Sequence, residues 1–148
     1  MTLLQKLADT KAPPAVILIR IFVGGIFISE GIQKFLFPAE IGAGRFAKIG
    51  IPSPEFVAPF VGCFEIACGA FVLLGLCTRL AVVPLTIVMI TAIVTTKVPI
   101  LIDAGFWKAA HEARTDWSML LALLFLFVVG AGRWSVDAIL SRNTHANL

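Results

Sequence analysis

Four long apolar stretches constrain this chain of 148 residues more than any other feature of its sequence. They cover residues 14–37, 54–76, 78–96 and 117–134 approximately, and a helix of about 20 such residues crosses a hydrocarbon core of roughly 30 Å. The chain is 59% hydrophobic and only 14% charged, with a mean hydropathy of +0.97, so a water-soluble surface is excluded. We therefore predict an all-α membrane protein.

The connections between the four stretches alternate in length. The first (about 38–53) and the third (about 97–116) are long, whereas the second is a tight turn around residues 75–79. Short links favour antiparallel neighbours, which predicts an up-down-up-down bundle of four transmembrane helices in one domain, 1–148. Both long connections then lie on one side of the membrane, and both termini lie on the other side with the tight turn.

The first dozen residues lack the uninterrupted apolar core of a cleavable signal peptide. Leu3, Leu4 and Leu7 share one helical face, which predicts a short interfacial helix over about residues 2–9. A frayed terminus is the alternative.

Basic residues outside the stretches or at their ends are evenly divided, five on the terminus side and five on the loop side. The terminus side carries two acidic residues and the loop side carries five, so net positive charge gathers at the termini. Because basic loops stay in the cytoplasm, we expect both termini to be cytoplasmic in a bacterial-type membrane.

Four ionisable residues lie within the apolar stretches more than two residues from either end: Arg20, Glu30, Lys34 and Glu65. A charge among lipid tails costs at least about 2.5–3.5 kcal/mol on insertion scales, so such residues face the bundle interior, pair or reach toward an interface. They are therefore the candidate functional residues. The alternative is that a buried pair only fixes the register of two helices.

Spacing places these charges on two faces that carry small residues. One face of the first helix carries Arg20, Gly24, Phe27, Gly31 and Lys34. One face of the second carries Ala58, Gly62, Glu65 and Gly69. Small residues let helices approach closely, so we predict that the two faces meet.

Two charged clusters follow from this arrangement. Glu30 precedes Lys34 by four residues, the favourable order for an ion pair, and Glu65 should join them in a cluster open toward the long loops. A second, structural ion-pair cluster should gather Arg20 near Asp137 at the terminus side. Arg79 or Arg133 should lie close to that second cluster.

Several site types lack their usual residues. The only histidines, His111 and His145, lie outside the apolar stretches, so bis-histidine haem ligation inside the bundle is excluded. Cys63, Cys68 and Cys77 have no zinc-type spacing and are interpreted as packing residues, with a redox role as the alternative. We expect no metal site, no covalently bound cofactor and no nucleic-acid partner.

The order and spacing of three strings extend through almost the whole chain: RIFVGGIFISEGIQKF, GIPSPEFVAPFVGCFEIACGAFVLLGLCTRLA and GAGRWSVD. In these strings the chain resembles the DoxX family of small four-helix membrane proteins. The resemblance implies a bundle with cytoplasmic termini and a link to quinone-coupled redox chemistry, since some relatives are subunits of quinone-dependent oxidoreductases. Glu30 stands where the family is expected to carry a smaller or neutral residue.

The leading hypothesis is a quinone-associated accessory subunit of a membrane redox complex. Glu30, Lys34 and Glu65 would bind the polar headgroup, and Phe27, Phe35 and Phe64 would line its ring. Electrons would come from a partner protein, because the sequence offers no electron carrier. The alternatives are a non-catalytic assembly or anchoring protein and a small-solute or proton carrier formed by a homo-oligomer.

Overall fold

The computed structural model describes residues 12–146, so the predicted interfacial helix at 2–9 lies outside the described residues. The described chain is helical and carries no strand, which confirms the all-α class. The helices in chain order are α2 (Val16–Leu36), α3 (Ala43–Lys48), α4 (Pro54–Leu74), α5 (Thr78–Ala92), the π-helical segment η1 (Ile93–Lys97), α6 (Val98–Ala104), α7 (Phe106–Glu112), α8 (Arg114–Val129) and α9 (Val136–Ala146).

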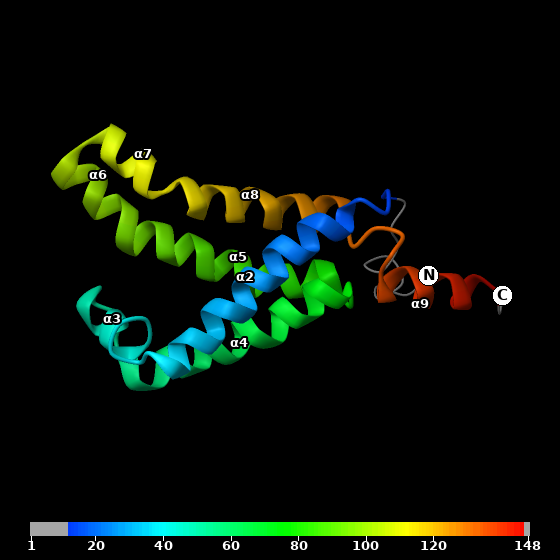
Figure 1. The fold of residues 1–148 in the computed structure, drawn as a ribbon, viewed down its shortest axis with the longest axis horizontal. Coiled ribbons are helices and arrows are strands. Elements are labelled where there is room, and N and C mark those ends of the chain that lie inside the picture. The colour runs from blue at the N-terminus through cyan, green and yellow to red at the C-terminus, as the bar shows by residue number, and fades with distance from the viewer. Residues whose placement is uncertain (1–11, 147–148) are drawn as a thin grey trace.

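Two helix pairs build the molecule: α2 packs along α4, and α5 packs along α8. The two long connections, with α3 in one and α6–α7 in the other, lie at one end, and α9 lies at the opposite end near the start of α2 (Figure 1). A hydrogen bond from Arg133 N–H to the carbonyl of Ala12 joins the two chain segments there. The core sits where the pairs meet, and its centre includes Val72, Val82, Leu85, Leu123 and Leu126.

Glycines set the close contact between α2 and α4. A Cβ on Gly24 would lie 2.7 Å from the carbonyl oxygen of Gly69, and one on Gly31 would lie 2.7 Å from that of Gly62. No side chain larger than hydrogen fits at these two positions without movement. The prediction that the two glycine-bearing faces meet is therefore confirmed.

A tight turn connects α4 to α5. Gly75 ends α4 with φ +70°, a left-handed conformation that favours glycine, and Leu76 N–H bonds back to the carbonyl of Phe71. A Cβ on Gly75 would also lie 2.7 Å from Cζ of Arg20. This turn thus leaves room for a buried arginine from α2.

The third apolar helix is longer than predicted. It continues without a break from Thr78 to Ala104, 27 residues, instead of ending near Thr96. The sequence Lys97-Val98-Pro99 suggests an end, but the π-helical turn widens the helix there, and Pro99 lies in the first turn of α6, where its missing N–H is tolerated. The connection predicted at 97–116 is therefore mostly helical.

The fourth apolar stretch is shifted toward the N-terminus relative to its prediction. α8 begins at Arg114 and ends at Val129, not at Trp117 and Trp134, because Gly130 and Gly132 adopt φ near +80° and break the helix. Within residues 12–146, three helices are long and apolar enough to cross a membrane: Val16–Leu36, Pro54–Leu74 and Thr78–Ala104. The 16-residue α8 is not among these three, so the structure supports three candidate spans rather than the predicted four.

The helix contact gives a stability prediction. Gly31→Ala should lower the free energy of unfolding by about 1–3 kcal/mol, because the added methyl group overpacks a backbone contact. Gly25→Ala on the same helix is the matched control, since its Cβ would have nothing within 4 Å. SDS titration followed by far-UV circular dichroism measures both. Equal stabilities of the two variants would contradict the packing described here.

Candidate functional site

A buried ion pair joins α2 and α4 near the end of the long connections. The Lys34 Nζ atom lies 2.6 Å from Oε2 of Glu65, and the two side chains are 8% and 3% exposed. The pair lies one helical turn from the Gly31–Gly62 contact, which brings the two backbones close enough for these side chains to meet. The structure thus brings together two of the three residues predicted for the first cluster.

Glu30, the third residue, lies nearby but does not pair as predicted. Within the described residues the ammonium of Lys34 takes Glu65 as its ion-pair partner and donates to the backbone carbonyl of Glu30 at 3.5 Å. The Glu30 residue is exposed. Lys34 pairs with Glu65 because Glu65 projects from the facing helix and is buried with it, whereas Glu30 lines the cavity at an exposed position.

A cavity of about 590 Å³ opens beside the ion pair. Its lining comes from both helix pairs and from the first long connection, so it lies at the end of the molecule that carries the long connections. Apolar side chains dominate the lining, among them Phe27, Phe46, Ile51, Val61 and Met119. Its size and chemistry are those of a site for an apolar small molecule with a few polar contacts.

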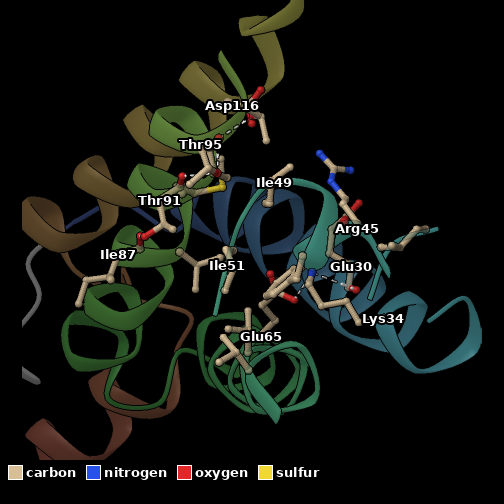
Figure 2. A pocket seen from close by; sticks show the side chains of 18 of the residues that line it. Glu30, Lys34, Arg45, Ile49, Ile51, Glu65, Ile87, Thr91, Thr95 and Asp116 are labelled. Atoms are coloured by element: carbon tan, nitrogen blue, oxygen red, sulfur yellow. Dashed lines mark hydrogen bonds and ion pairs between the residues drawn. The ribbon is translucent and has the colours of Figure 1, made fainter. Parts of the chain in front are cut away.

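The cavity has two polar walls (Figure 2). On the α2–α4 wall lie Glu30, Lys34 and Glu65, and Arg45 from α3 lies beside them. The other wall, from α5, η1 and α8, carries Thr91, Thr95, Thr96, Thr115 and Asp116. Asp116 pairs with Lys97 at 3.3 Å.

Sequence reasoning missed the second polar wall. Arg45 lies in the first long connection, and Thr91, Thr95 and Thr96 lie at the end of the third apolar stretch, where no site is predicted. Their spacing was a usable signal, because Thr91 and Thr95 are four residues apart and Thr96 is adjacent. Asp116 falls at the end of the predicted third connection, whereas in the structure it lies in the first turn of α8.

The predicted aromatic residues divide between the two sides of the helices. Phe27 is 2% exposed and lines the cavity. Phe64 is 42% exposed and packs against Phe60, with ring centroids 4.8 Å apart, on the outward face of α4. Phe35 is likewise exposed. The structure corrects the predicted position of Phe64 and Phe35, since neither is among the residues that line the cavity. The ring of Phe35 instead packs over Gly62 of α4, where a Cβ would lie 2.9 Å from its Cε2 atom.

The second predicted cluster lies at the opposite end and is centred on Arg20. This residue is 2% exposed. Its guanidinium donates to the carbonyls of Val72 and Leu73 at the end of α4, and to those of Ala131 and Trp134 after α8. Within residues 12–146 it bonds to carbonyl groups rather than to the Asp137 carboxylate, so the expected ion pair is replaced by backbone contacts.

Asp137 and Arg79 also bind backbone groups. The Asp137 carboxylate accepts from the N–H groups of Cys77 at 2.7 Å and Thr78 at 3.0 Å, at the start of α5. Arg79 donates to the carbonyls of Phe127 and Val128 near the end of α8. This end of the molecule is therefore held by charged side chains that bind helix termini, which is a structural arrangement.

Among the described residues, no group of three His, Cys, Asp or Glu side chains is placed to hold a metal ion. The three cysteines are free thiols; Cys68 is buried, but Cys63 and Cys77 are exposed. The packing role predicted for all three therefore applies to Cys68 alone.

Comparison with known proteins gives a family match. The model of the DoxX family matches residues 15–98. The chain is 52% identical over 147 residues to "Uncharacterized membrane protein Rv3486" of Mycobacterium tuberculosis (strain ATCC 25618 / H37Rv), covering 95% of this chain and 90% of that protein. It is 31% identical over 121 residues to "Putative oxidoreductase CatD" of Bacillus subtilis (strain 168), covering 82% and 83% of the two chains. No solved structure matches this chain.

The carbonyl contacts of Arg20 predict that a positive charge without the guanidinium geometry does not maintain the stability of the protein. Arg20→Lys should lower the free energy of unfolding by at least about 1.5–3 kcal/mol, because lysine cannot donate to four carbonyls from two directions. Arg133→Lys, at an exposed position, is the control and should change little. Full stability of Arg20→Lys in SDS titration would refute the role given to the guanidinium.

The ion pair predicts a non-additive double-mutant cycle. Lys34→Met and Glu65→Met should each destabilise the protein by about 3–5 kcal/mol, since each leaves one buried charge without its partner. The double variant should regain most of that loss. Unfolding free energies of the four proteins test this, and strictly additive losses would show that the pair is not coupled.

Proposed function

Because this chain belongs to the DoxX family of membrane proteins, we propose that it is a quinone-associated subunit of a membrane redox complex. The observation that carries the proposal is the apolar cavity of about 590 Å³ with the buried Lys34–Glu65 pair in its wall. The similarity to a protein named as an oxidoreductase supports a redox association.

The residues of the cavity fit a quinone headgroup. Lys34 has an ammonium, which donates but does not accept, and a quinone oxygen is an acceptor. Phe27 offers an apolar ring on the same face of α2, one and two turns from Glu30 and Lys34. The remaining apolar lining excludes water from the headgroup.

A bound quinone supplies two-electron chemistry that consumes two protons. In this chain Glu65 is the buried group that can hold a proton beside the headgroup, and Lys34 orients its carboxylate. Glu30 is exposed at the same wall and connects the cavity to the loop side. The electrons require a partner protein, so the proposal includes a redox partner in the membrane.

The proposed topology has four membrane crossings. α8 runs back from α7 to the end of the molecule where the chain enters α2, so it returns the chain to the side of the termini (Figure 1). Its 16 residues extend about 24 Å, somewhat less than the hydrocarbon core. The charge distribution supports cytoplasmic placement of the end that carries Arg79, Arg133 and Asp137.

The assembly alternative loses its main argument in this structure. An assembly protein would bind a partner helix through faces of small residues, but Gly24, Gly31, Gly62 and Gly69 are occupied by the contact between α2 and α4. No comparable observation favours a carrier, so the quinone proposal stands first.

Photolabelling with an azidoquinone in lipid nanodiscs tests the proposal. Label should appear in peptides from α2, α3 and α4, and unlabelled decylubiquinone should displace it. In Lys34→Met/Glu65→Met the apparent affinity should fall by about tenfold or more, the effect of losing a hydrogen bond to a charged group.

Glu65→Gln removes the negative charge of that side chain and keeps its shape. Glu55→Gln is the control, because it makes the same chemical change on α4 at an exposed position outside the cavity. The control should bind like the unaltered protein. Labelling that unlabelled quinone does not displace, or an affinity that survives loss of the ion pair, would refute the proposal.

A further inference from the structure

We propose that the cavity selects the hydroxyl-bearing, reduced form of its ligand, a hydroquinone, over the quinone. The inference rests on the proposed function and assigns a role to the second polar wall, which carries Thr91, Thr95, Thr96 and Asp116. Quinone and hydroquinone share a ring and a tail. They differ in hydrogen bonding, because the two oxygens of a quinone only accept, whereas those of a hydroquinone also donate.

The threonine hydroxyls on this wall have already used their hydrogens. The Oγ1 atom of Thr91 donates to the carbonyl of Ile87 at 2.9 Å, that of Thr95 to Thr91 at 2.8 Å, and that of Thr96 to Ala92 at 2.6 Å. A hydroxyl carries one hydrogen and two lone pairs. Each of these oxygens therefore presents acceptor capacity alone to the cavity.

Asp116 adds further hydrogen-bond acceptors to this wall. An ionised carboxylate only accepts hydrogen bonds, and its ion-pair partner Lys97 does not line the cavity. The wall from α5, η1 and α8 is thus rich in acceptors. Its threonines occur around the π-helical turn Ile93–Lys97, a feature frequent at functional sites.

The facing wall also carries donors, the ammonium of Lys34 and the guanidinium of Arg45. The ammonium of Lys34 is a donor, and Figure 2 shows it across the cavity from Thr91, Thr95 and Asp116. A hydroquinone matches both walls, since one oxygen accepts from Lys34 and the other donates to Thr95 or Thr96. A quinone meets the second wall acceptor to acceptor, unless a threonine gives up its bond to the helix.

The expected selectivity follows from that bond. A hydrogen bond contributes about 0.5–1.5 kcal/mol net, which corresponds to a factor of about 2 to 12 in affinity. The hydroquinone should therefore bind about 2- to 12-fold more tightly than the quinone with the same ring and tail.

The test compares decylubiquinol with decylubiquinone as competitors of azidoquinone labelling, in nanodiscs under anaerobic conditions. Thr95→Val/Thr96→Val removes two acceptors at nearly constant shape and should bring the affinity ratio close to 1 by weakening hydroquinone binding relative to quinone binding. Thr86→Val is the control, because Thr86 makes the same intrahelical bond, to Val82 at 2.7 Å, on α5 outside the cavity.

The outcomes separate the two proposals. A preference for the hydroquinone that disappears in the double valine variant and persists in Thr86→Val supports the inference. Equal affinities in the unaltered protein, or a preference that survives in the double valine variant, overturn the inference and leave the proposed function standing. Displacement by neither competitor overturns both.

Discussion

The close approach of α2 and α4 is the constraint on which the rest of the structure depends. Gly24 faces Gly69 and Gly31 faces Gly62, and at each place a methyl group would enter the space of a carbonyl oxygen. Because the backbones are that near, Lys34 and Glu65 reach each other across one interface. The same contact leaves the outer surfaces of both helices to large apolar side chains such as Phe56 and Phe60, which suit lipid.

Charged residues serve different purposes at the two ends of the molecule. At the terminus end, Arg20, Arg79 and Asp137 bind carbonyl and N–H groups that helices leave without partners where they end. These groups are part of the scaffold. At the other end, the Lys34–Glu65 pair lies beside a cavity and has no helix terminus to satisfy, so its cost in stability calls for a functional explanation.

Helical periodicity predicted the features that depend on one face of one helix. Gly24, Gly31 and Lys34 recur at spacings that place them together, and the facing residues of α4 do the same, so the contact and the ion pair followed from sequence. Helical periodicity did not predict features that depend on local changes in helix geometry. The helix continues through Lys97-Val98-Pro99 because a π-helical turn intervenes, and periodicity carries no signal for such a turn. The second polar wall was not predicted because each threonine hydroxyl donates to a carbonyl of its own helix. Such threonines are compatible with an apolar membrane span.

The unbroken length of the third helix has a consequence for how the protein fits its bilayer. Twenty-seven residues from Thr78 to Ala104 extend about 40 Å, roughly 10 Å more than the hydrocarbon core. Such hydrophobic mismatch is accommodated by tilt or by local thickening of the bilayer. A tilted α5–η1–α6 would diverge from the α2–α4 pair toward the end that carries the cavity. A thinner bilayer would then increase the tilt of this helix and with it the width of the cavity beside it.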